Sequence, residues 1–301
     1  MLRSFPFSNV NTLIFSWIRD NDVLKSFPKY FSRRRCDLSI MFIFAQKKVG
    51  MNTKDFFLNR RTVRKYSNKP VSDELLTELL TQAEHAPTTG NMQLYSVVVT
   101  RDPERKKQLA PAHFNQPSVI GCSALLTFCA DYNRFVRWCE ISDATPGYDN
   151  FQSFVTAVLD TALFAQQFCT IAEMNGLGCC YLGTTTYNAP LISEILNLPE
   201  LVVPVATIAL GYPEGQTQVS DRLDVGAIMH NEVYKDYSDE DIKQAYAEKE
   251  AREDSKMFVK ENGKRTLAQV FTDIRYTKAS AIEFSKIYLD YIRKQGYKIP
   301  F

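Results

Sequence analysis

The apolar run Val202–Leu210 constrains the fold more than any other segment of this chain. It contains no charged residue, it is rich in β-branched side chains, and it ends at Gly211-Tyr212-Pro213. It is far too short to span a membrane, which requires about 20 apolar residues. A short continuous apolar run bounded by turn residues is typical of a strand buried on both faces. We therefore expect a central strand here.

Helical and strand patterns alternate irregularly around this run. The capping residue Ser72, followed by two acidic residues, predicts a helix that ends before Pro87. Further helices are expected at Pro103–Ala110, Gln152–Asn175 (closed by Gly176), Pro190–Leu196 and Ser280–Gln295, strands at Leu94–Thr100, Ala124–Ala130 and Cys179–Leu182, and a charged, solvated helical excursion at 231–261. No Gly-x-Gly-x-x-Gly opens a helix, which disfavours a Rossmann domain. This pattern predicts one α+β domain.

The first fifty residues do not share this regularity. They carry nine Lys/Arg and three acidic residues, whereas the rest carries 27 basic and 31 acidic ones. We expect residues 1–50 to be a disordered or untranslated extension, and residues 51–301, which begin at Met51, to form the domain. A basic anchor to a membrane surface is the alternative for the extension. The mildly acidic body argues against bulk binding of nucleic acid or membrane.

Two further absences narrow the chemistry. The seven cysteines include no Cys-x-x-Cys pair, and three scattered histidines supply no zinc ligand set, so we expect reduced, buried thiols and a cytoplasmic protein. No Ser-His-Asp set, Cys-His set or carboxylate pair stands out either. If the chain is an enzyme, a cofactor is expected to carry the chemistry.

Three segments are candidates for the site that holds such a cofactor. The basic segment 60–66 (Arg-Arg-Thr-Val-Arg-Lys-Tyr) could clamp a phosphate, or could be a solvated turn. The loop 86–93 (Ala-Pro-Thr-Thr-Gly-Asn-Met-Gln) could contact a polar heterocycle edge, or could be a simple turn. The segment 176–184 is rich in small residues, which suits either a flat ligand or close packing of helix on strand.

Together, these motifs resemble the nitroreductase family, and within it the NADPH-dependent oxygen-insensitive nitroreductase and flavin reductase group. The resemblance runs from Lys54 to the C-terminus, apart from the charged excursion. Besides 60–64, 86–93 and 176–183, it rests on Phe-Cys-Ala-Asp-Tyr-Asn-Arg at 128–134, Asp-Thr-Ala at 160–162, Gly211-Tyr212-Pro213 with Arg222-Leu223, and Asp-Tyr-Ile-Arg-Lys-Gln-Gly-Tyr at 290–297.

The resemblance implies a fold and an assembly. The family folds as a mixed sheet flanked by helices, and two chains interlock as a homodimer through long helices and swapped tails. FMN is held non-covalently at the dimer interface, and NADPH or NADH serves as co-substrate.

The resemblance also implies roles for individual residues. Arg60, Thr62, Arg64 and Arg222 match positions that hold the FMN phosphate and ribityl chain. Thr88, Asn91, Gln93 and Gln116 match positions around the pyrimidine edge of the flavin. Tyr181, Leu182, Gly183 and Thr184 match the segment beside its reactive N5 atom. Lys264 and Arg265 lie where the group meets the extra phosphate of NADPH, or could belong to a solvated turn between two helices.

Two positions depart from the group's pattern. Ser220 stands where a basic residue is usual, so one phosphate contact is lost or is supplied by Arg61. Thr184 stands where the group favours a second glycine, and its side chain could narrow the acceptor pocket.

The implied activity is transfer of hydride from NAD(P)H through FMN to nitroaromatics, quinones or free flavin, by a two-electron ping-pong mechanism. No catalytic side chain is expected, because solvent can protonate the product. The partners are a second copy of the chain and a small-molecule electron acceptor. The alternatives are a flavin-fragmenting or dehalogenating enzyme of the same fold, a non-catalytic FMN-binding protein, and a nucleic-acid binder with a basic tail.

Overall fold

The computed structural model describes residues 53–300. The predictions for residues 1–50 therefore lie outside the described residues. A short helix, α3 (Thr53–Leu58), precedes Arg60.

The core is a four-stranded sheet in the order β1-β2-β4-β3, formed by β1 (Tyr95–Thr100), β2 (Ala124–Asp131), β3 (Gly178–Leu182) and β4 (Val202–Gly211). The predicted central strand is confirmed, because β4 pairs with β2 on one side and with β3 on the other. All three pairings are antiparallel. The expectation of a mixed sheet is therefore wrong for the described residues, whose only parallel pairing is the isolated bridge between Asn150 and Lys298.

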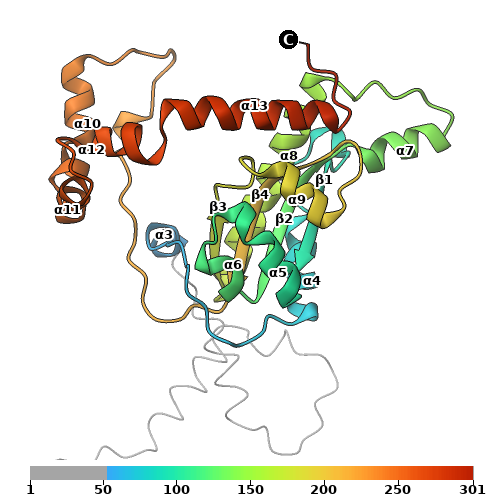
Figure 1. Ribbon diagram of the computed structural model, residues 1–301, viewed down its shortest axis with the longest axis horizontal. Coiled ribbons are helices and arrows are strands. Elements are labelled where there is room, and N and C mark those ends of the chain that lie inside the picture. The colour runs from blue at the N-terminus through green and yellow to red at the C-terminus, as the bar shows by residue number, and fades with distance from the viewer. Residues whose placement is uncertain (1–52, 301) are drawn as a thin grey trace, which may run out of the picture. The chain divides into compact units, whose positions relative to one another are not determined.

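Helices cover both faces of the sheet (Figure 1). On one face, α4 (Asp73–Ala83) and the long α8 (Phe151–Met174) pack on alternate residues of the strands, including Leu126, Phe128 and Ile208. On the other face, α5 (Pro103–Leu109), α6 (Pro117–Gly121) and α9 (Ala189–Leu196) cover Leu125 and Ala209. The period-two alternation of each strand thus supplies two apolar layers.

The ends of these helices follow the local signals in the sequence. Ser72 caps α4 by accepting a hydrogen bond from the Leu75 N–H at 3.2 Å. Gly176 has a φ of +77° after the end of α8, and the Leu177 N–H donates to the Ala172 carbonyl, as in a Schellman motif. Helix α4 ends four residues before Pro87, earlier than the proline alone would require.

The C-terminal part of the chain is helical. The charged excursion forms α10 (Asp239–Ala251) and α11 (Glu253–Glu261), followed by α12 (Leu267–Val270) and the π-helical turn η5 (Phe271–Arg275). The predicted terminal helix is α13 (Lys278–Lys294), which packs Tyr291 and Ile292 against the end of the sheet. The sequence patterns did not predict α7 (Asn133–Ile141).

Helix α8 is, among the described helices, the one long and apolar enough in composition to cross a membrane. Ten of its residues are buried in the protein, among them Phe164 and Phe168 in the main core. Its outer face is also apolar, with Leu159 59% and Leu163 47% exposed. The helix therefore serves as a core helix on one side and leaves an uncovered apolar face on the other.

Candidate functional site

The basic segment 60–66 lies alongside strands β3 and β4. The Val63 N–H donates to the Cys179 carbonyl at 3.0 Å, and the Tyr66 hydroxyl donates to the carbonyls of Val63 and Ala209 at 2.7 and 2.9 Å. Gly178 is required here, because a Cβ at that position would lie 2.5 Å from the Val63 Cβ. With Val63 and Tyr66 buried, the side chains of Arg61, Arg64 and Lys65 are exposed.

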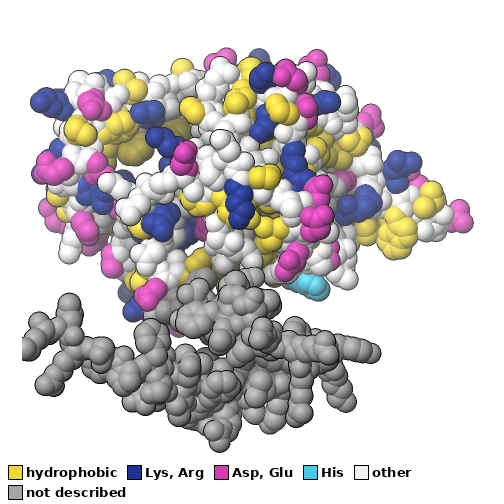
Figure 2. Space-filling view, turned by 90° about the horizontal axis from the view of Figure 1, so that it is seen from below, with side chains coloured by type: hydrophobic (Ala, Val, Ile, Leu, Met, Phe, Trp, Pro, Cys, Tyr) yellow, Lys and Arg dark blue, Asp and Glu magenta, His cyan; other side chains and the backbone are white. Residues whose placement is uncertain are grey.

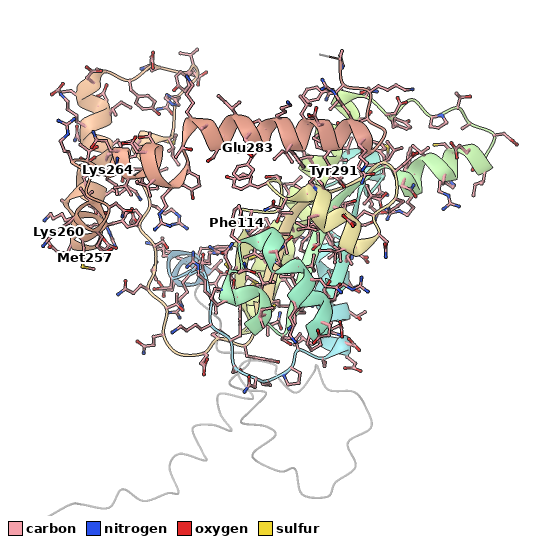
Figure 3. The ribbon with its side chains drawn as sticks, viewed as in Figure 1. Phe114, Met257, Lys260, Lys264, Glu283 and Tyr291 are labelled. Atoms are coloured by element: carbon pink, nitrogen blue, oxygen red, sulfur yellow. The ribbon has the colours of Figure 1, made fainter. Side chains whose placement is uncertain are left out.

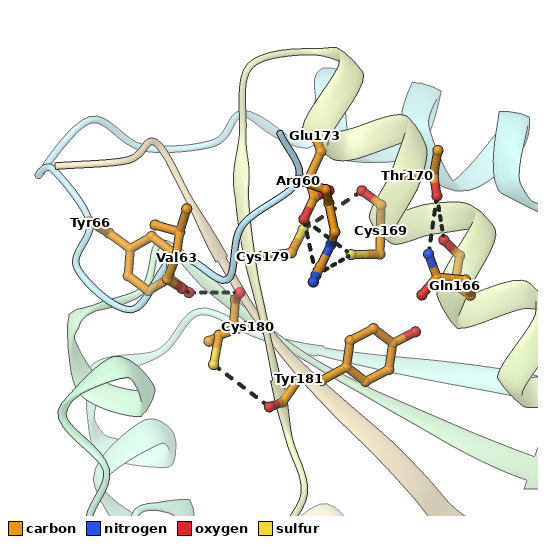
Figure 4. Close-up of polar contacts among 11 residues, drawn as sticks. Arg60, Val63, Tyr66, Gln166, Cys169, Thr170, Glu173, Cys179, Cys180 and Tyr181 are labelled. Atoms are coloured by element: carbon orange, nitrogen blue, oxygen red, sulfur yellow. Dashed lines mark hydrogen bonds and ion pairs between the residues drawn. The ribbon is translucent and has the colours of Figure 1, made fainter. Parts of the chain in front are cut away.

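Arg60 is held by a partly buried ion pair at the end of α8 (Figure 4). Its Nη2 lies 3.2 Å from Glu173 Oε1 and 3.8 Å from Cys169 Sγ. Burial raises the pKa of the Glu173 carboxyl, and Arg60 offsets this only in part. Burial lowers the pKa of the Arg60 guanidinium, but Glu173 and Cys169 more than compensate, so that the net effect is a rise.

Three side chains of types that can bind a metal ion lie together at this corner, a grouping that the sequence did not predict. The ligand atoms of Cys169, Glu173 and Cys179 lie within 4.8 Å of one another. The guanidinium of Arg60 already neutralises the carboxylate, and its positive charge opposes a cation at this position. The six described cysteines are buried and free, as predicted, and Cys36 lies outside the described residues.

The other predicted phosphate-binding residues are open to solvent. The Arg61 Nη1 donates to the Thr217 carbonyl at 3.4 Å, which places the segment after β4 beside the basic segment. Arg64 is exposed and forms no ion pair among residues 53–300. Thr62, which stands between Arg61 and Arg64 in the sequence, is half-buried. Exposed guanidinium groups without a carboxylate partner, such as that of Arg64, are suited to bind an anion such as phosphate.

Arg222 is not brought to this cluster by any contact in the described structure. Its Nη1 donates to its neighbouring carbonyl at Asp221 at 2.7 Å. It lines a groove of about 390 Å³ together with residues of α10, and Lys249 and Asp221, which form an ion pair at 2.8 Å, line the same groove. A phosphate contact by Arg222 thus remains a prediction.

The loop 86–93 is organised by a carboxylate that sequence reasoning did not single out as a site residue. Asp160, buried on α8, accepts hydrogen bonds from the Thr88 hydroxyl at 2.6 Å, from the Thr89 hydroxyl at 2.9 Å and from the Thr89 N–H at 3.0 Å. The Thr88 oxygen also accepts from the Gln93 N–H at 3.0 Å. The hydrogen bonds of the Thr88 side chain therefore stabilise the loop conformation. The contact between Thr88 and the flavin stays a prediction.

Asn91 and Gln93 are exposed residues of this loop. Both have left-handed backbone conformations, with φ of 56° and 55°, next to Gly90 at 56°. Arg134, from the 128–134 motif, donates to the Gln93 and Tyr95 carbonyls and so fixes this conformation. Backbone held in this region is favoured at binding sites, and the two amide side chains face solvent, available for a ligand.

Two further loops that carry predicted flavin contacts are linked to each other. Gln116 ends the loop 110–116, and the segment 181–184 contains the last two residues of β3 and the two that follow it. His113 Nδ1 lies 2.9 Å from Thr184 Oγ1, and the Asn188 amide donates to the Ala112 carbonyl at 2.8 Å.

The segment from 181 to 184 has an accessible residue, Gly183, next to a buried one, Leu182. Gly183 has nothing within 4 Å of the position a Cβ would take, so a ligand can approach its backbone. Leu182 is buried, whereas Tyr181 is partly exposed, and burial of its hydroxyl region raises the pKa of Tyr181.

A cleft of about 310 Å³ begins two residues after Thr184 and reaches α13. Its lining includes the rings of Tyr187 and Phe284, which stack at 4.4 Å. Outside the lining, Phe114, which lies below α13 in Figure 3, tilts against Phe284 at 6.3 Å. Arg275 is the cation in its lining. Such a cleft suits a flat organic molecule.

Lys264 and Arg265 lie in the turn between α11 and α12, with Gly263 at a φ of 61°, and their contact with NADPH stays a prediction. The Lys264 ammonium forms an ion pair with Asp273 at 3.0 Å, which holds the pKa of that carboxyl below its usual value. Arg265 is exposed. The turn lies apart from the basic segment in Figure 3, and positive and negative side chains are interspersed over the face in Figure 2.

Three residues of this region were missed because their partners lie far away in the sequence. Asp160 and Glu173 are acids on a largely apolar helix, and His113 is a histidine with 0% exposure in a short loop. A charged or titratable residue within an apolar pattern is the one signal that could have marked them.

Residues 58–212 match the model of the nitroreductase family. This stretch contains the basic segment, the loop 86–93, the whole sheet and the segment 181–184. The chain therefore belongs to the nitroreductase family.

Individual relatives agree with this family. A Cr(VI) reductase of Pseudomonas sp. strain G-1 is 32% identical over 193 residues, covering 64% of this chain and 79% of the relative. An FMN reductase (NADPH) of Bacillus subtilis strain 168 is 31% identical over 194 residues, covering 63% and 77%. A crystal structure from Bacteroides fragilis NCTC 9343, which carries only a general assignment as an oxidoreductase, is 52% identical with a TM-score of 0.80 and covers 81% of this chain and 99% of that one.

Proposed function

We propose that the chain is an FMN-dependent oxidoreductase that transfers hydride from NAD(P)H to a small electron-poor acceptor, such as a nitroaromatic compound, a quinone or free flavin. The observation that carries this proposal is the basic segment 60–66, which lies beside β3 through the Val63–Cys179 hydrogen bond, in a family whose relatives include an FMN reductase. FMN supplies the two-electron chemistry when it is bound.

The donor set fits the phosphate of FMN. Guanidinium groups form bidentate, charge-assisted hydrogen bonds with phosphate, and Arg64 has no competing carboxylate among residues 53–300. Glu173 orients Arg60 from the buried side. FMN has one phosphate group, which the basic segment 60–66 can hold, and the sequence contains no dinucleotide fingerprint.

The polar loops fit the ring of FMN. Asn91, Gln93 and Gln116 offer amide groups for its pyrimidine edge, and Gly183 leaves its backbone accessible beside the expected N5 position. The aromatic cleft near Tyr187 and Phe284 provides stacking surfaces for an acceptor or a nicotinamide. Acceptor choice then depends on the shape of this cleft.

No side chain in this arrangement has to act as general acid or base. Solvent supplies the proton, and the residues of the site bind and orient the flavin and the substrates. Ping-pong kinetics follow, because donor and acceptor use the same space in turn.

The active form is proposed to be an interlocked homodimer. The exposed apolar face of α8, with Leu159 and Leu163, supports burial against a second copy of the chain. We further propose that residues 51–301 form the FMN-binding domain, that the protein is cytoplasmic, and that its partners are small molecules rather than nucleic acid or membrane.

The test is steady-state turnover by the purified full-length chain. NADPH and NADH oxidation should depend on added nitrofurazone or a quinone and should follow ping-pong kinetics. Bound flavin without NAD(P)H oxidation would instead indicate a non-catalytic FMN-binding protein. Turnover of a halogenated phenol or breakdown of flavin itself, without quinone reduction, would indicate the dehalogenating or flavin-fragmenting alternatives.

A further inference from the structure

His113 contacts the predicted flavin segment although no role has been assigned to it. Its side chain is 0% exposed, and its Nδ1 lies 2.9 Å from the Oγ1 of Thr184. Its second ring nitrogen, Nε2, is buried and has no hydrogen-bond partner among residues 53–300. The contact between His113 and Thr184 joins the loop that carries Gln116 to the segment that carries Gly183.

The imidazole is fixed in place by its loop. His113 ends the 3₁₀ turn η3 (Pro111–His113), and the next two residues, Phe114 and Asn115, both have a φ of 52°. The Asn188 amide donates to the Ala112 carbonyl and closes the same junction from the other side. Two consecutive non-glycine residues in the left-handed region persist only where the surroundings determine the backbone.

Burial lowers the pKa of His113 to about 4, so the ring is neutral at neutral pH and carries one proton. If that proton were on Nε2, a buried N–H donor would lack an acceptor. If it is on Nδ1, the Nδ1–H donates to Thr184 Oγ1 and only a lone pair is left without a partner. The second tautomer avoids an unpaired buried donor and is therefore favoured.

This tautomer determines the role of the Thr184 hydroxyl. A threonine oxygen that accepts from His113 still carries its own hydrogen, which must point away from the imidazole. Thr184 is half-buried, and its hydroxyl has no other partner among the described residues. The free hydrogen is then available to a ligand beside the segment 181–184.

We propose that His113 is a positioning residue that presents the Thr184 hydroxyl as a hydrogen-bond donor to a ring heteroatom of the bound flavin. The inference rests on the proposed function. It gives a purpose to the side chain at position 184, where the resembling group favours glycine. The competing interpretation is that the pair only joins two loops.

The tautomer is tested first, in the flavin-free full-length protein. Long-range ¹H–¹⁵N spectra of histidine-labelled protein report which ring nitrogen carries the proton, and the His113→Asn variant assigns the signal. A neutral ring with the proton on Nδ1 is expected. A proton on Nε2 would overturn the inference while leaving the proposed function intact.

The ligand contact is tested by FMN titration of Thr184→Val, Thr184→Ser and the matched control Thr185→Val. The Thr185 hydroxyl is also buried and donates to the Leu182 carbonyl at 2.9 Å, but it does not contact His113. Thr184→Val should weaken FMN binding by about 2- to 10-fold. Thr184→Ser should restore it, and Thr185→Val should lower thermal stability without changing FMN affinity.

Equal FMN affinity of Thr184→Val and wild type would overturn the inference, as would an equal loss in both valine variants. A wild-type chain that binds no FMN would overturn the proposed function and this inference together. Should Thr184→Val fail to fold, Thr184→Ala compared with Thr184→Ser gives the same contrast.

Discussion

The Arg60 guanidinium and the Glu173 carboxylate, 3.2 Å apart, form an ion pair that is largely withdrawn from water, with side-chain exposures of 26% and 11%. One partner comes from the basic segment and the other from the last turn of α8. The pair therefore connects the proposed phosphate site to the core of the fold.

Removing one partner should destabilise the fold. Arg60→Ala leaves the Glu173 carboxylate in a partly buried position without its counter-charge, which should lower the free energy of unfolding by about 1–3 kcal/mol. The exposed Arg61→Ala is the control and should change it by less than about 0.5 kcal/mol. Urea denaturation of the flavin-free protein measures both. Equal stability of the two variants would show that the ion pair contributes nothing.

The proposed phosphate clamp makes a prediction about affinity. Arg64→Ala and Arg222→Ala should each remove a charge-assisted contact worth about 1.5–3 kcal/mol, so FMN affinity should fall by about 10- to 100-fold. The flavin-free proteins should stay folded, because both side chains are exposed. Fluorescence titration with FMN measures the change. Unchanged affinity in both variants would place the phosphate elsewhere.

Cofactor preference is expected to depend on the turn between α11 and α12. The Lys264→Ala, Arg265→Ala double variant should raise the KM for NADPH and leave that for NADH unchanged. Maximal turnover should hardly change, because a contact far from the transferred hydride contributes the same binding energy in the ground state and in the transition state. Steady-state kinetics with both nucleotides measure this. An equal effect on NADPH and NADH would mean that these residues do not recognise the extra phosphate.

Acidification should weaken the fold through His113. Its pKa is lowered by burial to about 4 in the folded chain, against about 6.5 when unfolded, so the unfolded state binds more protons between these values. The contribution of neutral His113 to the free energy of unfolding should therefore be fully present above pH 6.5, and it should fall by about 3 kcal/mol as the pH drops towards 4. His113→Asn should lack this component. The raised pKa of Glu173 acts in the opposite direction, so the difference between the two proteins is the quantity to measure.

Local patterns accounted for much of the fold. The cap at Ser72, the glycine after α8 and the apolar run of β4 all act within a few residues, and the structure confirms each of them. The antiparallel pairing did not follow from them, because register is set between strands distant in the sequence. It includes a shift between Phe128 and Cys129 that no local signal marks.

The same difference between local signals and contacts of distant residues holds for the candidate site. The basic segment and the loop 86–93 could be located from their composition alone. Their supporting residues could not, since Asp160 meets Thr88 and Glu173 meets Arg60 only after α8 has packed on the sheet. Buried acids on an apolar helix indicate that a polar partner exists, without identifying it.

The identity of the bound cofactor tests the central claim most directly. The full-length protein, purified without added flavin, should be yellow, and the flavin released on denaturation should be FMN rather than FAD. A colourless protein that takes up no flavin when soaked with FMN would contradict the account.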